Sequence, residues 1–361
     1  MSRSSIILMA ILVILMIYCL DANAVAPLQL VKSQCYVGPQ SQKLGGTIIV
    51  YFRIHNPNPF SVKIGLGCSI KPVEGEWIDD KPHDEEPSVP HGYSTQSRYF
   101  DIPSYISNGL YTVGYGIMDG GISGPYFDTH ESNDLTVVSS SKTVYVDDSN
   151  SAGPWKGTSN NPFQYIQDGI YVAVDGDTVL VADGEYTGTG NVNLTFKGKA
   201  ITVKSMNGAE NCVIDCQGSE NTRGFWFRDN EGTGSILDGF TIQNGNIEGT
   251  QPINYNGGGI RCDSSSPIIR NNIITNNSAL HYGGGIYAYY SSSIIENNII
   301  KENSTDVNGG GILLRKCSSL IIKNNMITKN SSHMAGGIDC DTSSLEINGN
   351  KIIENYAHAS A

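Results

Sequence analysis

Short apolar runs alternate with Ser, Asn and Gly through the second half of the chain, and their spacing is regular. The phrase Gly-Gly-Gly-Ile ends at Ile260, Ile286 and Ile312, and a variant that begins with Ala ends at Ile338, so the period is 26 residues. The apolar runs are too short and too rich in β-branched residues for helices. A fixed period of this size is typical of solenoids, whose units bury apolar faces against their neighbours. We therefore predict a coil of stacked parallel strands.

Strand alternation sorts the residues after each Gly-Gly-Gly into inward and outward columns. The four isoleucines form one inward column. The second inward column is Cys262, Ala288, Leu314 and Cys340. Both are apolar, as stacking of coils requires. The residues between them are expected to face solvent, and they form the columns Arg261, Tyr287, Leu313, Asp339 and Asp263, Tyr289, Arg315, Asp341.

A second phrase, rich in paired asparagines, occupies residues 270–277, 296–303, 323–330 and 348–355. Asn tolerates the left-handed conformation that a sharp corner between strands needs. Stacked corners also allow the side-chain amides to bond along the coil axis. We predict a structural role for these asparagines and not a catalytic one.

The segment before the regular units favours the same architecture. Asn161 as N-cap and Pro162 as first residue predict a short helix, with Phe163, Ile166 and Ile170 on its apolar face. Two irregular coils follow it, which gives about six coils with the four regular units.

These repeats resemble right-handed parallel β-helix proteins of the pectin-lyase-like kind over residues 141–361. The phrase Ile-x-x-Asn, as in 274–277 and 300–303, also makes them similar to the repeats of polymorphic outer-membrane proteins. The resemblance implies that the helix caps the first coil and that an active groove would lie on the outward columns. It specifies the fold far more closely than the activity.

A secretory signal peptide is predicted at residues 1–24, from Arg3, the apolar run 6–20 and Ala22-Asn-Ala24. The competing interpretation is a membrane anchor, but the run is short for a span of about 20 residues. Cleavage would yield a secreted or cell-surface protein with no other membrane span.

Residues 25–140 lack the repeat. Strands are expected at 47–54, 61–70 and 109–117, with Pro-rich turns between them. This pattern predicts an antiparallel β-sandwich that is similar to immunoglobulin-like accessory modules. The fold class is therefore all-β, with a sandwich followed by a β-helix.

The last repeat ends at Asn355, close to the final residue, Ala361. An open coil end exposes unpaired backbone groups. Either the natural chain continues past Ala361 or a partner chain covers this end, and we favour a truncated chain.

The formal net charge of −12 disfavours binding to nucleic acid and to anionic membranes. A polysaccharide or cell-surface glycan is the expected partner instead, because tyrosine rings stack on sugars while Asp and Arg pair with hydroxyls or carboxylates. The candidate ligand-binding residues are Arg261, Asp263, Tyr287, Tyr289, Arg315 and Asp341.

Asp339, Asp341 and Arg315 are the candidates for catalysis. The two carboxylates of Asp339 and Asp341 would stand about 6–7 Å apart on one strand face. This distance is at the lower limit of the separation expected between the two carboxyl groups of an inverting glycosidase. The competing interpretation is that exposed strands simply carry mixed polar residues.

Motifs of the resembled enzymes are largely missing. Polygalacturonase-like sites combine Asn-Thr-Asp, Asp-Asp, Gly-His-Gly and Arg-Ile-Lys, whereas the Asp-Asp pairs here, Asp79-Asp80 and Asp147-Asp148, lie outside the coils. No metal or other cofactor is expected. Calcium at Asp147, Asp148 and Asn150 is the alternative, although a polar turn explains these residues as well.

We therefore predict a secreted or cell-surface β-helix scaffold or adhesin that binds extended carbohydrate on the outer face of its coils. The alternative is a polysaccharide-active enzyme: a lyase, an epimerase or a glycoside hydrolase. A third interpretation, an exported passenger domain, rests on the repeat resemblance. An acid and a base clustered beside the tyrosines would favour an enzyme, and a flat face would favour a scaffold.

Overall fold

The computed structural model describes residues 28–39, 41–43, 46–72, 75–79, 85–103, 106, 109–119, 126–138, 142–248 and 255–358. The predicted signal peptide lies outside these residues. Within the described ranges, no helix combines the length and the apolar character that a membrane span requires. The chain forms two compact units. One is built around 50–100 and 111–134, and the other around 135–361 together with 37–49 and 101–110.

The N-terminal region consists of antiparallel sheets, as predicted, apart from the parallel pairing of β3 with β10. In the larger sheet the strand order is β3-β10-β9-β5-β6, with β7 also on β5, and in the smaller it is β1-β4-β2, with β8 on β4. The bounds are β1 (Gln29–Leu30), η1 (Lys32–Gln34), β2 (Tyr36–Gly38), β3 (Ser41–Lys43), β4 (Thr47–Asn56), β5 (Val62–Pro72), β6 (Ile78–Asp79), β7 (Ser88–Val89), β8 (Gly92–Asp101), β9 (Gly109–Asp119) and β10 (Tyr126–Val138).

The three strands expected in this region are present as β4, β5 and β9, while β8 and β10 were not predicted. These two strands, the longest of those that were missed, are rich in polar residues. In β8, half-buried and exposed positions alternate over most of the strand, because one face meets solvent. A polar strand of this kind lacks the apolar run that sequence patterns detect.

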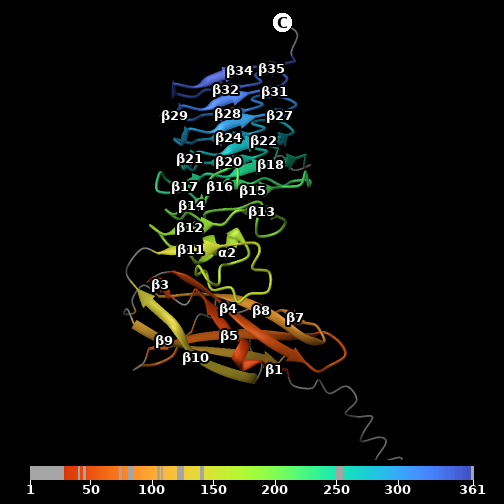
Figure 1. Cartoon of the computed structure of the whole chain (residues 1–361), viewed down its shortest axis with the longest axis vertical. Coiled ribbons are helices and arrows are strands. Elements are labelled where there is room, and N and C mark those ends of the chain that lie inside the picture. The colour runs from red at the N-terminus through yellow and green to blue at the C-terminus, as the bar shows by residue number, and fades with distance from the viewer. Residues whose placement is uncertain are drawn as a thin grey trace, which may run out of the picture. The chain divides into compact units, whose positions relative to one another are not determined.

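The second unit is a solenoid of four parallel sheets, whose stacked coils are visible in Figure 1. One sheet has eight strands and the next has seven, so the coil makes about seven turns where the sequence predicted six. The extra turn comes from β11, β12 and β13, which precede the irregular coils. The eight-stranded sheet contains β11 (Thr143–Val146), β12 (Thr178–Val181), β14 (Thr202–Ser205), β17 (Ile236–Asp238), β21 (Ile268–Arg270), β25 (Ile294–Glu296), β29 (Leu320–Lys323) and β33 (Leu345–Asn348).

The other three sheets complete the later coils. The seven-stranded sheet contains β13 (Gly184–Thr187), β15 (Cys212–Asp215), β18 (Thr241–Gln243), β22 (Ile273–Thr275), β26 (Ile299–Lys301), β30 (Met326–Thr328) and β34 (Lys351–Ile353). The sheet of the Gly-Gly-Gly-Ile strands contains β16 (Phe225–Phe227), β20 (Ile260–Asp263), β24 (Ile286–Tyr289), β28 (Ile312–Arg315) and β32 (Ile338–Asp341). The last contains β19 (Asn246–Ile247), β23 (Ser278–Ala279), β27 (Ser304–Thr305), β31 (Ser331–Ser332) and β35 (Tyr356–Ala357).

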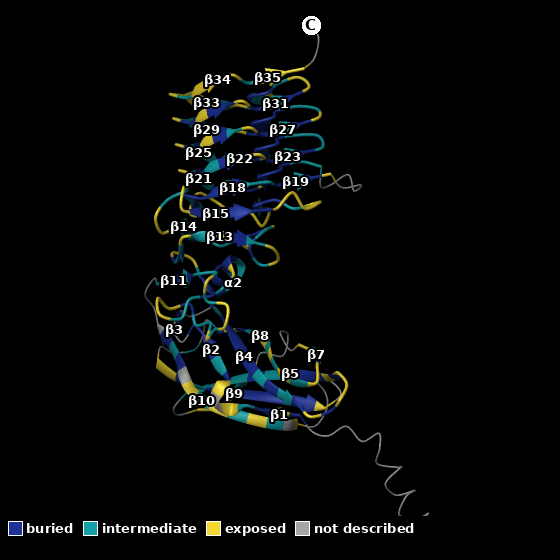
Figure 2. Cartoon of the chain, turned by 45° about the vertical axis from the view of Figure 1, so that its right-hand side comes forward, coloured by how far each residue is buried: buried dark blue, intermediate teal, exposed yellow. Residues whose placement is uncertain are grey.

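The predicted inward columns form the core of the regular coils. Ile260, Ile286 and Ile312 pair in register and are fully buried, and Figure 2 shows buried strands through the stack. In the last described coil the column continues, but Ile338 is only partly buried and Cys340 is exposed. The prediction that Cys340 is a buried core residue is wrong, because its coil has a described neighbour on one side only.

The asparagine corners are also as predicted. The first residue of each pair has a positive φ, 56° at both Asn271 and Asn297, in the left-handed region that Asn tolerates. The second residue turns inward and joins a ladder. Asn272 Nδ2 donates to Asn298 Oδ1 at 3.1 Å, and Asn298 Nδ2 donates to Asn325 Oδ1 at 3.0 Å. A parallel ladder runs through Asn277, Asn303, Asn330 and Asn355.

The helix begins later than predicted. It is α2 (Ile166–Val172), and its N-cap position is Tyr165. Asn161 instead closes a turn with Thr158, and Phe163 bridges to β11. The helix start is capped from a distance, because the Ile166 backbone N–H donates to Asn191 Oδ1 at 3.0 Å. A cap that comes from the next coil leaves no local signature in the sequence.

Candidate functional site

The predicted site residues lie on the sheet of the Gly-Gly-Gly-Ile strands. Register pairs Arg261 with Tyr287, Leu313 and Asp339 in one row. The next outward row is Asp263, Tyr289, Arg315 and Asp341. The topology therefore brings together all residues that the sequence proposed for ligand binding or catalysis.

Three of the four residues in the first of these rows are buried, which corrects the prediction that they face solvent. Arg261, Tyr287 and Leu313 are 6%, 4% and 2% exposed. The chain before each strand passes close to this row at glycines with positive φ, such as Gly283 and Gly309. A Cβ added to Gly309 would lie 2.7 Å from Leu313 Cβ. The accessible part of this face is therefore its second row and the residues that follow it.

An indole surrounded by guanidinium groups lies at one end of the face. Trp226, on β16, donates from Nε1 to Asp263 Oδ2 at 2.7 Å, and Arg261 Nε donates to the same oxygen at 2.7 Å. The guanidinium carbons of Arg223, Arg228 and Arg261 lie 5.0, 4.4 and 5.0 Å from the centre of a Trp226 ring. Burial, and then the charge of Arg261, lower the pKa of Arg223 to about 9.

The sequence did not identify this cluster. Trp226 pairs in register with Arg261, but the coil between them is longer than the regular repeat, so stepping by the period misses it. The available signal was the alternation in Phe225-Trp-Phe227, where the two phenylalanines point inward and the indole outward.

Three aromatic rings continue the face toward solvent. The rings of Tyr287 and Tyr289 are 6.5 Å apart and nearly parallel, and those of Tyr289 and Tyr290 are 4.4 Å apart and edge to face. Lys316 Nζ lies 5.4 Å from the centre of the Tyr290 ring. A hydrogen bond between these two groups raises the pKa of Lys316 and lowers the pKa of Tyr290. Tyr290 is 53% exposed.

The candidate catalytic residues already have protein partners. Arg315 Nε lies 2.9 Å from Asp341 Oδ2, in an ion pair whose side chains are both close to half exposed. Asn308 Nδ2 donates to Asp339 Oδ2 at 2.7 Å. Asp263 accepts from Trp226 and Arg261, as described above. All three aspartates of this face are thus engaged by donors of the protein itself.

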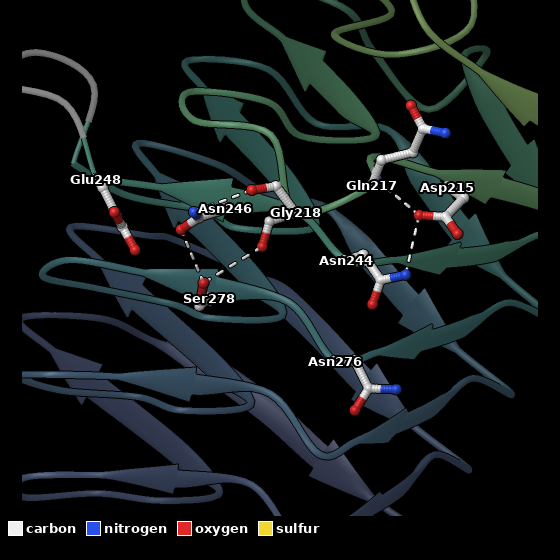
Figure 3. A pocket seen from close by; sticks show the side chains of 9 residues that line it. Asp215, Gln217, Gly218, Asn244, Asn246, Glu248, Asn276 and Ser278 are labelled. Carbon is white, nitrogen blue, oxygen red and sulfur yellow. Dashed lines mark hydrogen bonds between the residues drawn. The ribbon is translucent and has the colours of Figure 1, made fainter.

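A polar hollow of about 520 Å³ lies elsewhere on the coils, at the corners near β18 and β19. Figure 3 shows its lining, with Asp215 at one end and Glu248 at the other. Asp215 Oδ1 accepts from the Gln217 backbone N–H at 2.7 Å and from Asn244 Nδ2 at 2.9 Å, and its other oxygen accepts from Gln243. The Asp215 carboxylate is therefore used to close corners, and this hollow is a surface feature of the turns.

The residues considered for calcium form a turn. Asp147 Oδ1 accepts from the Ser149 backbone N–H at 2.9 Å, and Asn150 Nδ2 donates to the Pro162 carbonyl at 2.7 Å. Among the described residues, no group of three or more His, Cys, Asp or Glu is placed to hold a metal ion. Calcium binding here stays a prediction.

The coils and their register define a right-handed parallel β-helix repeat protein. Residues 205–361 match the family described as the right handed beta helix region, so the fold predicted from the repeats is confirmed. The similarity to polymorphic outer-membrane repeats stays a resemblance. No curated protein matches the sequence.

Several solved structures are similar over part of the chain. The alkylpurine DNA glycosylase AlkC of Pseudomonas fluorescens is 16% identical over 34% of this chain and 33% of its own, with a TM-score of 0.23. A β-glucosidase from Listeria innocua is 17% identical over 31% and 16%, with a TM-score of 0.22. The CARDB domain of a Pyrococcus furiosus protein is 12% identical over 33% and 99%, with a TM-score of 0.20. The chain spans about a third of the glycosylase's length, and TM-scores this low do not define a shared fold.

Proposed function

We propose that the β-helix is the scaffold of a secreted or cell-surface protein that binds extended carbohydrate along the exposed margin of its outer face. The observation that carries this proposal is the ring pair of Tyr289 and Tyr290 beside the Lys316 ammonium. Exposed rings stack on the C–H faces of sugars, and an adjacent cation or ion pair bonds to their hydroxyls.

The ion pair of Arg315 and Asp341 extends this surface over the next two coils, because Arg315 follows Tyr289 on β28 and Asp341 follows it on β32. Both side chains reach solvent, so their remaining donors and acceptors are available to sugar hydroxyls. Arg261 and Tyr287 are buried. They support the surface from below and would not touch the ligand.

An adhesive scaffold fits this face better than an enzyme does. An acid and a base at work on a glycosidic bond must exchange protons with the substrate. Asp263, Asp339 and Asp341 are instead held by an indole, an amide and guanidinium groups. The polysaccharide lyase, epimerase and hydrolase alternatives therefore rank second.

Affinity electrophoresis of the full chain in gels that contain neutral or uronic-acid polysaccharides tests the proposal. We expect at least one polysaccharide to retard the wild type, and Tyr289→Ala with Tyr290→Ala to weaken that binding by about tenfold or more. Tyr356→Ala is the matched control, because Tyr356 is 59% exposed on the same coils but outside this face. Equal binding by the double variant would refute the proposed site, and release of new sugar ends by the wild type would favour the enzyme.

A further inference from the structure

The larger antiparallel sheet carries glycines on one face at adjacent positions. Gly67 of β5 lies opposite Gly116 of β9, and Ser69 lies opposite Gly114. Strand alternation places these four residues on the same side of the sheet. Cys68 and Tyr115, which lie between them along the strands, are 5% and 2% exposed and face the core. The glycine face is therefore the face directed away from the core.

Backbone conformation does not account for these glycines. Gly67, Gly114 and Gly116 are not among the described residues with positive φ, so any residue fits their backbone. Glycine weakens a strand interior, and it often marks a place where another group approaches closely. A Cβ on Gly116 would lie 2.4 Å from Tyr126 Cε1, and one on Gly114 would lie 3.1 Å from Trp77 Cζ3. The missing side chains make room for two aromatic rings.

The two rings border an open hollow of about 410 Å³. Trp77 and Tyr126 are 39% and 64% exposed, so part of each ring is open to solvent beside the hollow. Asp79 and Glu131, both exposed, also line the hollow. Ser69 Oγ donates to Asp79 Oδ1, which orients that carboxylate on the sheet face.

We infer that this hollow binds a neutral oligosaccharide of pyranose units. The glycine floor is flat, so a sugar ring can approach the sheet, and Trp77 and Tyr126 offer surfaces for its C–H faces. Asp79 and Glu131 accept hydrogen bonds from hydroxyl groups. Lys71 Nζ lies 5.8 Å from the centre of a Trp77 ring, so the two carboxylates outnumber this ammonium group and their charge disfavours uronic acids and sulfated sugars. The site lies wholly in the first compact unit, and it shares no residue with the β-helix face.

Isothermal titration calorimetry of the full chain with cellohexaose, laminarihexaose, mannohexaose and xylohexaose tests the inference. We expect at least one hexasaccharide to bind with a Kd below about 1 mM. Trp77→Ala should weaken that binding by about tenfold or more. Tyr93→Ala, which removes an exposed tyrosine of β8 outside the hollow, and the Tyr289→Ala, Tyr290→Ala double variant should bind as the wild type does.

Gly67→Thr is a second variant, in case Trp77→Ala does not fold. It adds a β-branched side chain to the floor, where a Cβ meets only the Met118 methyl at 3.1 Å, so the fold should persist while the hollow is filled. Failure of all four hexasaccharides to bind, or wild-type binding by folded Trp77→Ala and Gly67→Thr, overturns the inference. So does preferential binding of hexaproline, which would make the hollow a peptide groove. Loss of sugar binding in the β-helix double variant alone would leave only the proposed function standing.

Discussion

Glycine has different uses in the two compact units. In the coils, a Cβ on Gly284 would lie 2.4 Å from the Ser304 carbonyl oxygen and 2.6 Å from the Gly310 carbonyl oxygen. In the antiparallel sheet, a Cβ on Gly116 would meet the ring of an exposed tyrosine. Backbone of a neighbouring coil cannot move aside without loss of its hydrogen bonds, whereas an exposed ring can rotate. The atoms that a Cβ would contact therefore distinguish the two uses: backbone atoms mark a glycine needed for coil packing, and an exposed ring marks one that shapes a surface.

The largest expected effect is that of Gly284→Ala. Because both close neighbours are backbone atoms of the next coil, we expect the unfolding free energy to fall by about 4 kcal/mol or more. Gly116→Ala should lower it by less than about 1 kcal/mol, because only the Tyr126 ring must move. Guanidinium unfolding followed by circular dichroism measures both. Similar losses of unfolding free energy in the two variants would contradict the proposed difference between the glycines of the two units.

A smaller but still large effect is expected inside the asparagine ladder. Asn303 is fully buried, accepts from the Asn277 backbone and side chain, and donates to the Ile274 carbonyl. Asn303→Ala leaves these groups buried without partners, at a cost of about 3 kcal/mol. Asn297→Gly is the matched control, because it replaces an exposed corner residue with a φ of 56° by one that adopts this conformation readily.

Hydrogen exchange sharpens the ladder prediction. Asn303→Ala should speed amide exchange in the neighbouring coils, from about Gly258 to Ser332, and leave β5 and β9 unchanged. An unchanged unfolding midpoint in Asn303→Ala, or one that falls equally in Asn297→Gly, would show that the ladder does not stabilise the coils.

The repeat made the β-helix predictable because one pattern recurs at a fixed period. Four copies of Gly-Gly-Gly-Ile set the register of β20, β24, β28 and β32, and the inward columns and asparagine corners follow from it. In the segments that do not follow the 26-residue period, the sequence did not predict the structure. Trp226 lies in an irregular coil, and α2 is capped by Asn191 from a separate segment.

Features that depend on the path of the chain in space were not predictable from the pattern. Tyr287 alternates as an outward residue, but it is only 4% exposed, and a Cβ on Gly283 would lie 2.9 Å from Tyr287 Cα. The hollow at Trp77 and Tyr126 arises because an antiparallel register sets Gly67 opposite Gly116. Gly67 and Gly116 are far apart in the sequence and belong to no repeat, so no sequence pattern indicated that they lie opposite each other.

Alkaline pH should weaken both units, because both bury thiols. Burial raises the pKa of Cys35, in the antiparallel region, to about 11 and the pKa of Cys216, in the coils, to about 12. An unfolded thiol ionises near pH 8.5, whereas the folded one keeps its proton. This stability is therefore complete below about pH 8.5 and is lost, at about 1.4 kcal/mol per pH unit for each thiol, as the pH rises toward the folded pKa.

Lys199 acts in the opposite direction. Burial lowers its pKa to about 8, so from about pH 8 to about pH 10.5 the unfolded chain binds a proton that the folded chain does not, and this group favours folding more as the pH rises. The thiols outweigh it, because burial also raises the pKa of Cys212, Cys262 and Cys317.

Urea midpoints measured under reducing conditions from about pH 8 to about pH 11 should therefore fall. Regional hydrogen exchange should show Cys216→Ala reducing this slope for the coils and Cys35→Ala reducing it for the antiparallel sheets. Urea midpoints that do not change with pH would mean that water reaches these thiols. A pH dependence that neither variant changes would mean that other groups cause it. If each variant reduces the pH dependence of stability only in its own unit, each unit excludes water from its own core. The effect of a glycine substitution can then be predicted from its neighbours within the same unit.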